Sequence, residues 1–181
     1  VLNVLARMMA PLLYFTTEEG WDNIHAPGKV SSVHMSDWPD VKKEMEGWED
    51  AALDEKWSRI LEIRDAVMKL LEVKRENGLV GSSLEAGITL HSGNSEMAGF
   101  LRENAGLFPA VLKVSRVKVL ESPEEKMDKA PGADLSIGVE KAPGSKCQRC
   151  WNWSETVGSR PEAPEVCDRC HNVIQERSRR D

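Results

Sequence analysis

All four cysteines of this 181-residue chain fall in two pairs near its C-terminal end, and their spacing constrains the local fold more than any other feature. The pairs read Cys147-Gln-Arg-Cys150 and Cys167-Asp-Arg-Cys170, with sixteen residues between them. Two residues between thiols let both sulfurs of a tight turn face one ion, and zinc takes four such ligands in a tetrahedron. The intervening length also fits such sites. The spacing therefore predicts one zinc site formed by Cys147, Cys150, Cys167 and Cys170.

Other interpretations of these cysteines compete with zinc. Two disulfides would suit an oxidising compartment, and a redox C-x-x-C motif would suit a thioredoxin-like unit, which nothing else in the sequence indicates. The spacing alone leaves iron in a rubredoxin-like site open, and His171 could replace Cys170 as a ligand. Because four protein ligands leave no open coordination position, we expect the site to be structural and not catalytic.

The charge distribution restricts how this chain could contact a nucleic acid. Its net charge of −6 argues against general nucleic-acid affinity. Residues 141–181 hold eight Lys or Arg against six Asp or Glu, whereas residues 1–140 hold sixteen against twenty-four. Zinc with four thiolates carries a charge of −2, so the metal-loaded C-terminal part would be near neutral. Any RNA contact must then come from a few placed side chains and not from bulk charge.

The two ends and the hydropathy of the chain indicate its cellular setting. No run of eighteen apolar residues occurs, so we predict no membrane span. No charged-then-apolar leader is present, which favours a cytoplasmic location over secretion. The chain starts at Val1, within an amphipathic helical pattern, so we expect it to be a piece of a longer protein.

The N-terminal part reads as helical. Apolar residues recur at three- and four-residue steps over residues 1–13, with Pro11 as a possible kink. We expect Thr16 to cap a second helix with Glu19 as its capping-box partner, Phe15 to pack as a hydrophobic staple, and Trp21 to be buried between the two helices.

A loop and the longest helix should follow. Residues 25–41 read as loop, with His34 at the surface and Trp38 as a buried anchor. The helix should run over residues 48–77 and stop at Gly78. Its predicted apolar stripe consists of Trp57, Ile60, Leu61, Val67, Met68 and Leu71.

The second half changes character. We predict strands over residues 86–91, 111–120 and 135–139, a short helix over 94–104, and an exposed hairpin or linker over 121–133. The fold class is therefore mainly α with a small α/β part. We expect three domains: a helical bundle over residues 1–80, a strand–helix–strand junction over 81–140, and a four-cysteine zinc ribbon over 141–181.

Four stretches together resemble one family. The segment Ala10-Pro-Leu-Leu-Tyr-Phe-Thr-Thr-Glu-Glu-Gly-Trp21 resembles the APxxxFxxEExW signature in the anticodon-binding helical bundle of class I aminoacyl-tRNA synthetases. Residues 32–39, 72–86 and the two cysteine knuckles are similar, in the same order, to the C-terminal region of bacterial isoleucyl-tRNA synthetases. The zinc-finger type also occurs in some DNA glycosylases.

The resemblance implies a function in translation. In that family the bundle and the zinc finger hold the anticodon end of the isoleucine tRNA, while ATP-dependent activation and transfer of isoleucine occur elsewhere in a monomeric enzyme. No segment like His-Ile-Gly-His or Lys-Met-Ser-Lys-Ser is present. We therefore expect this chain to be inactive alone, with a catalytic body and the anticodon stem-loop as its partners.

The zinc module carries side chains suited to RNA. Unpaired bases stack on aromatic rings or Arg planes, and phosphates attract cations. The candidates are Lys146, Arg149, Trp151, Trp153, Arg160 and Arg169. Alternatively, Trp151 packs over the zinc knuckle, Arg149 and Arg169 remain in water, and the module docks on protein or DNA without reading RNA.

Overall fold

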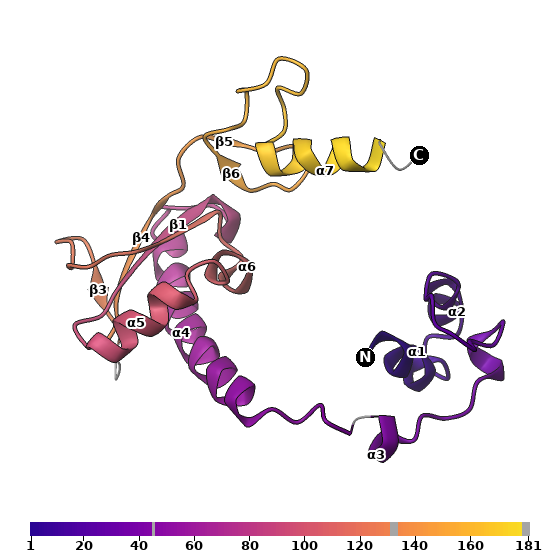
Figure 1. Cartoon of the computed structure of the whole chain (residues 1–181). Helices are drawn as coiled ribbons and strands as arrows, with labels where there is room; N and C mark the ends of the chain where they lie inside the picture. Colours follow the sequence, from indigo (N-terminus) through magenta and orange to yellow (C-terminus); the bar gives the residue numbers. More distant parts are fainter. Residues whose placement is uncertain (45, 131–133, 179–181) are drawn as a thin grey trace. The chain divides into compact units, whose positions relative to one another are not determined.

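A computed structural model describes residues 1–44, 46–130 and 134–178 of the chain (Figure 1). The chain forms two compact units, Val1–Lys56 and Trp57–Asp181. Helices predominate over two small sheets, in agreement with the predicted fold class. None of the helices in these described ranges combines the length and the apolar character that crossing a bilayer requires.

Pro11 ends the first helix instead of kinking it. Helix α1 covers Leu2–Met9, and the backbone N–H of Leu13 donates to the carbonyl of Met9 at 2.8 Å around the proline. Helix α2 then covers Tyr14–Asp22. Trp21 is 2% exposed, as predicted, and its Nε1 donates to the carbonyl of Val30 at 2.9 Å. This indole anchors the small core of the first unit.

Two predictions about the start of α2 are wrong. Thr16 does not cap it, because the helix already begins at Tyr14 and Thr17 Oγ1 donates to the carbonyl of Leu13 at 2.8 Å. Phe15 is 82% exposed and so does not form a staple. Once Pro11 has closed the preceding helix, the chain restarts its helical hydrogen bonds within three residues.

The following loop contains a short 3-10 turn, η1 (Val33–Met35), and the four-residue helix α3 (Val41–Glu44). Trp38, predicted to be a buried anchor, is 62% exposed. His34 is exposed, as expected; its ring stacks on Tyr14 with centroids 3.9 Å apart, and Nε2 lies 3.2 Å from the Tyr14 carbonyl.

Helix α4 covers Ala51–Glu76, close to the predicted range. Its buried stripe consists of Ile60, Ile63, Val67 and Leu71. Trp57 and Leu61, predicted on that stripe, are 40% and 47% exposed, because they lie to one side of the helix face that carries these four buried residues. Of these four, Ile63, Val67 and Leu71 belong to the core of the second unit.

That core is organised around a four-stranded sheet of order β2-β1-β4-β3. Strand β1 (Ala86–His91) pairs in parallel with β2 (Arg116–Val119) and antiparallel with β4 (Ser136–Lys141), which also pairs with β3 (Asp128–Lys129). All six residues of β1 are buried. This fits a strand at the middle of the sheet whose neighbours and covering helices share one core.

The crossover from β1 to β2 contains helix α5 (Ser95–Glu103), whose N-cap Asn94 accepts from the backbone N–H groups of Glu96 and Met97, and helix α6 (Phe108–Leu112). The single strand predicted over 111–120 is therefore wrong in its first half. Pro109 stands in the first turn of α6, where its missing N–H costs nothing. Lys113 ends the helix in the left-handed region with φ 53°.

The C-terminal module holds strands β5 (Ser145–Lys146) and β6 (Trp153–Ser154), followed by helix α7 (Asp168–Ser178). This helix was not predicted. The 3-10 turn η2 (Ser83–Glu85) precedes β1. The predicted hairpin or linker contains β3, and residues 131–133 within it lie outside the described residues.

Candidate metal centre and nucleic-acid interface

The four cysteine sulfurs form one cluster. All four Sγ atoms lie within 4.8 Å of one another, and Cys147, Cys167 and Cys170 are buried. The Sγ atoms of Cys150 and Cys167 are 3.8 Å apart. A tetrahedron with metal–sulfur distances of about 2.3 Å has edges of about 3.8 Å, so this pair already has the spacing of two zinc ligands.

The first knuckle is held by the short β5–β6 ribbon. The backbone N–H of Cys147 donates to the carbonyl of Asn152, and that of Trp151 donates to the carbonyl of Cys147, both at 2.9 Å. Trp151 has φ 65°, and Gly144, just before β5, has φ 89°. A Cβ on Gly144 would lie 2.2 Å from the carbonyl carbon of Ser154. Only glycine therefore lets the ribbon close at this point.

The second knuckle sits at the start of α7. The backbone N–H of Cys167 donates to Cys147 Sγ at 3.3 Å, which ties the two knuckles together. The N-terminal end of a helix carries partial positive charge, which favours thiolate at Cys167 and Cys170. Val157 and Val166 pack against the cysteines and complete the small core of the module.

The thiols differ in their acidity. Burial raises the pKa of Cys167 to about 12 and also raises the pKa of Cys150. Burial opposes ionisation of Cys147 as well, but hydrogen bonds from the backbone N–H groups of Cys150, Cys167 and Arg149 lower its pKa to about 6. Four thiolates this close repel one another unless they share a cation. The donor set therefore fits a divalent, sulfur-binding metal ion.

Each knuckle has an arginine in its third position, and the side chain of this arginine lies near the second cysteine of the other knuckle. Arg149 Nη1 donates to Cys170 Sγ at 3.6 Å. Burial disfavours the charged form of Arg169, but its side-chain hydrogen bond to Cys150 and the nearby thiolates outweigh this and raise its guanidinium pKa. Two guanidinium groups thus offset the net −2 charge that zinc and four thiolates would carry.

The predicted alternative ligand does not join the cluster. Among the described residues, the group close enough to share an ion contains Cys170 and not His171. His171 is buried, and its Nε2 lies 3.7 Å from a carboxylate oxygen of Glu162.

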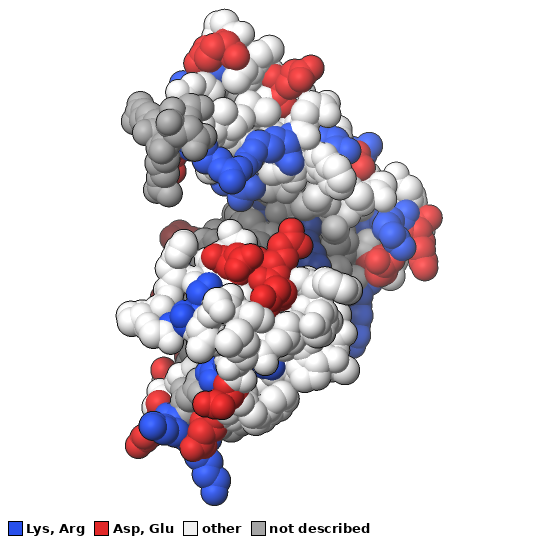
Figure 2. All heavy atoms as spheres, turned by 90° about the vertical axis from the view of Figure 1, so that its right-hand side faces the viewer, with Lys and Arg blue, Asp and Glu red and all other residues white. Residues whose placement is uncertain are grey.

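Three of the six candidate RNA-binding residues gather beside the first knuckle. Trp151 is 60% exposed, and Lys146 Nζ lies 5.4 Å from the centroid of its ring. Arg149 is also exposed. At this exposure the indole of Trp151 is open to solvent, contrary to the idea that it packs over the knuckle. Figure 2 shows Lys and Arg side chains in the upper part of the view, where the zinc module lies, with Asp and Glu side chains among them.

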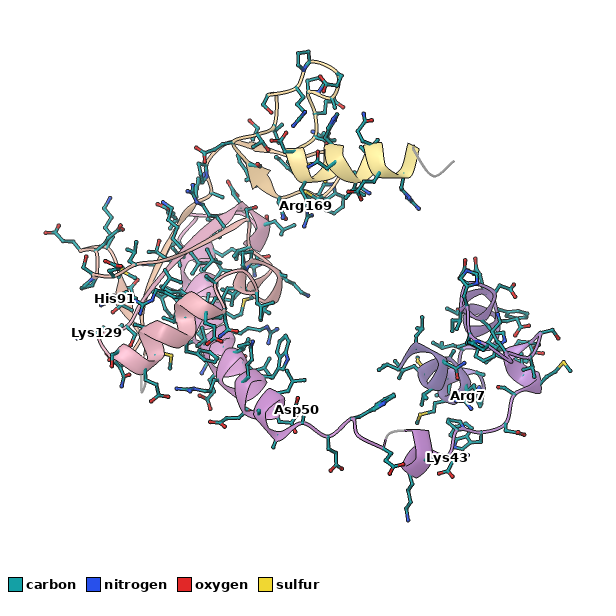
Figure 3. The ribbon with its side chains drawn as sticks, viewed as in Figure 1. Arg7, Lys43, Asp50, His91, Lys129 and Arg169 are labelled. Atoms are coloured by element: carbon teal, nitrogen blue, oxygen red, sulfur yellow. The ribbon has the colours of Figure 1, made fainter. Side chains whose placement is uncertain are left out.

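The other three candidates lie elsewhere. Trp153 is half-buried, and its backbone N–H donates to Ser115 Oγ at 2.7 Å, next to β2. Arg160 Nε lies 2.6 Å from Asp168 Oδ1 and pins the long loop to the start of α7. Arg169 projects from the first turn of α7 into a cleft that α6 also lines (Figure 3).

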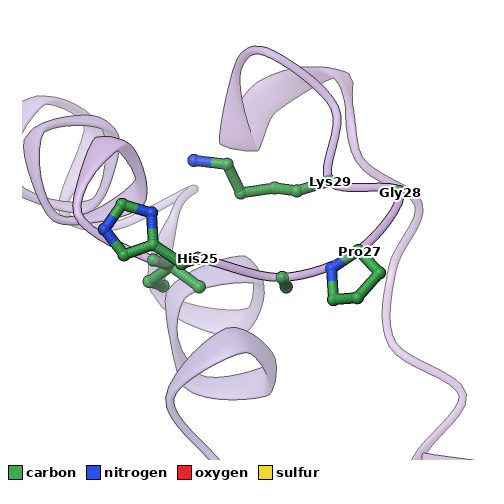
Figure 4. A pocket seen from close by; sticks show the side chains of 6 residues that line it. His25, Pro27, Gly28 and Lys29 are labelled. Atoms are coloured by element: carbon green, nitrogen blue, oxygen red, sulfur yellow. The ribbon is translucent and has the colours of Figure 1, made fainter.

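A second hollow lies in the first unit and holds no cluster of reactive groups. It is lined by the consecutive residues 24–29, including His25, Pro27 and Lys29 (Figure 4). Lys29 Nζ donates to the carbonyl of Trp21 at 2.6 Å, and this hydrogen bond links the loop to the end of α2. We assign no function to this hollow.

The comparisons with known proteins agree with the geometry. A family model described as the anticodon-binding domain of tRNA ligase matches residues 1–90, and one described as a zinc finger found in FPG and IleRS matches residues 144–173. The isoleucine–tRNA ligase of Carboxydothermus hydrogenoformans is 40% identical over 97% of this chain, and that of Geobacter sulfurreducens is 39% identical over the same share. The chain belongs to the isoleucine–tRNA ligase family.

This member of the isoleucine–tRNA ligase family spans 18% of the length of each of those two relatives. The zinc-finger match, together with the four-cysteine cluster, supports one structural zinc ion. Sequence reasoning missed the cleft residues Lys113 and Asn152 and the link through Ser115, because three distant segments meet there.

Proposed function

We propose that this chain is the tRNA-binding part of an isoleucine–tRNA ligase, in which it holds the anticodon end of the isoleucine tRNA and a zinc ion keeps the last module folded. The observation that carries the proposal is the pairing of two matches in one chain. An anticodon-binding domain occupies residues 1–90 and a zinc finger of the kind found in IleRS occupies residues 144–173.

The exposed group beside the first knuckle supplies the chemistry for RNA. The open face of Trp151 suits stacking of an unpaired base, worth roughly 1–3 kcal/mol per base. Lys146 stands next to it as a partner for phosphate, and Arg149 is an exposed cation of the same knuckle. We assign positioning roles to Arg160, which binds Asp168, and to Trp153, whose backbone bonds Ser115.

The remaining steps belong to the rest of the enzyme. ATP-dependent activation of isoleucine and its transfer to tRNA would take place on a catalytic body to which this chain is joined, in a monomeric cytoplasmic enzyme. Within the chain, we propose that residues 1–80 act as the bundle part, 81–140 as the junction and 141–181 as the zinc module.

A second candidate function is purely structural. The zinc module is tied to β2 by the Trp153–Ser115 hydrogen bond and by an ion pair of 3.4 Å between Arg116 and Glu155. These contacts suit a module that docks on protein and leaves RNA reading to the helices.

Titration of a fluorescent anticodon stem-loop of isoleucine tRNA separates the two candidates. The chain is titrated as prepared and after zinc chelation, each at two salt concentrations. We expect binding that weakens with salt, because phosphate contacts release counterions, and that is lost when zinc is removed. Binding that survives chelation would assign RNA reading to the helices and the zinc module to a structural role.

A further inference from the structure

A cleft of about 470 Å³ separates the zinc module from the α/β part of the same unit. Its lining comes from four separate stretches of the chain, two in the α/β part and two in the zinc module. Leu84 belongs to η2, Pro109 to α6 and Lys113 to the end of that helix, while Asn152 and Arg169 belong to the zinc module. Its volume falls within the range of roughly 300–1,000 Å³ that small-molecule ligands occupy.

The charges in this cleft are all of one sign. Lys113 and Arg169 line it, and no carboxylate is among its described lining residues. Within the described part of the chain neither cation forms an ion pair with an acidic side chain, whereas Arg116 and Arg160 nearby each do. The cleft therefore presents to a ligand the charge of Lys113 together with the guanidinium of Arg169, which also faces the cysteine thiolates, and this favours an anion.

The backbone fixes the points from which both cationic side chains project. Lys113 is held in the left-handed region with φ 53°, and the N–H of the next residue, Val114, donates to the carbonyl of Pro109 at 3.1 Å. Arg169 projects from the first turn of α7, and its side chain lies close enough to the Cys150 sulfur for that group to raise its pKa.

The remaining lining residues suit a flat, partly polar ring. Leu84, Pro109 and Ala110 form an apolar wall, and the side chain of Asn152 can donate to and accept from a base edge. We propose that the cleft takes one unstacked nucleotide of the bound RNA, with its phosphate between Lys113 and Arg169 and its base against the apolar wall. This inference rests on the proposed function.

The cleft also gives the zinc ion a consequence for RNA binding. Asn152 follows the first knuckle and Arg169 lies within the second, whereas Lys113 lies on the α/β part. Zinc therefore sets one wall of the nucleotide site without touching the RNA itself. An acidic protein surface is the other class of ligand for two cations, but it would leave the apolar wall unused.

Two variants test the proposal with the anticodon stem-loop as the probe. Lys113→Gln removes one charge outside the zinc module, and Ala110→Trp fills the cleft from an exposed position without removing a charge. We expect Lys113→Gln to weaken binding and to lower the slope of log affinity against log salt by about one. We expect Ala110→Trp to weaken binding by about five- to 150-fold, the range for loss of one stacked base.

Matched controls are Lys69→Gln and Ala52→Trp, both at exposed positions of α4. Zinc content and thermal unfolding should be unchanged in all four variants. If the unaltered chain binds the stem-loop and both cleft variants bind it equally well, the cleft proposal is overturned and the proposed function stands. If the unaltered chain does not bind the stem-loop, the cleft proposal and the proposed function are both overturned.

Discussion

Gly144 offers the sharpest test of how the zinc module closes. Replacing it with alanine adds one Cβ, which would lie 2.2 Å from the carbonyl carbon of Ser154, 2.3 Å from the oxygen of that carbonyl and 2.4 Å from the backbone nitrogen of Glu155. All three atoms are backbone and cannot rotate away. Strand β6 must therefore move, and β5–β6 pairing carries the first knuckle.

The chain provides a matched control in Gly158. Its φ is 88°, against 89° for Gly144, but a Cβ there would meet no atom within 4 Å. Alanine at either position carries the cost of a left-handed backbone, about 1–2 kcal/mol. Only Gly144→Ala adds the cost of forcing atoms into filled space, about 1–3 kcal/mol. We therefore expect Gly144→Ala to destabilise the module by about 2–5 kcal/mol and Gly158→Ala by about 1–2 kcal/mol.

Zinc affinity reports this difference, because zinc binding and folding of such a small module are coupled. Competition with a chromogenic chelator should show zinc held about five- to 150-fold more weakly by Gly144→Ala than by Gly158→Ala, since about 1.4 kcal/mol corresponds to a factor of ten. Equal zinc affinities in the two variants would refute the argument that the Gly144–Ser154 approach closes the site.

Three further predictions concern the cysteines, the helical unit and the arginines. Calorimetry of zinc binding in buffers of different ionisation enthalpy should show release of at least two protons at pH 7, because Cys150 and Cys167 have raised pKa values. Affinity should fall as pH falls, more steeply below the pKa of Cys147 at about 6; a pH-independent affinity would contradict thiolate ligation. Trp21→Ala should lower the free energy of unfolding by about 3–5 kcal/mol in denaturant titrations, because Trp21 is 2% exposed, whereas Trp38→Ala, at a position 62% exposed, should change it by less than about 0.5 kcal/mol. Arg149→Gln should weaken stem-loop binding more than Arg160→Gln does, because Arg160 is already paired with Asp168. The reverse order in the same titration would assign RNA binding to the long loop.

The zinc site was predictable because its signal is local. The spacing of the cysteines within each knuckle and between the knuckles specifies the ligand arrangement regardless of the surrounding fold. The structure confirms that the four sulfur atoms lie within 4.8 Å of one another. The glycine that lets the ribbon close is visible in the sequence, but the atom that it must avoid, on Ser154, is not. That contact depends on the pairing of β5 with β6.

The errors arose where local preference and tertiary context disagree. Valine at 111 and 114 suggests a strand, yet Pro109 opens a helical turn and the chain needs a crossover before β2. Trp38 reads as an anchor because tryptophan is usually buried, and only the fold reveals that it is open to solvent. The cleft lined by Lys113, Asn152 and Arg169 joins segments that no short pattern connects.

The most direct test of the central claim compares two anticodon stem-loops that differ only in the anticodon triplet. Fluorescence anisotropy with the zinc-loaded chain measures both affinities at one salt concentration, so phosphate contacts cancel in the ratio. If the chain reads the anticodon, the isoleucine triplet should bind at least about tenfold more tightly, as expected from one or more stacked or hydrogen-bonded bases. Equal affinities for the two triplets would contradict the assignment of this chain as an anticodon reader.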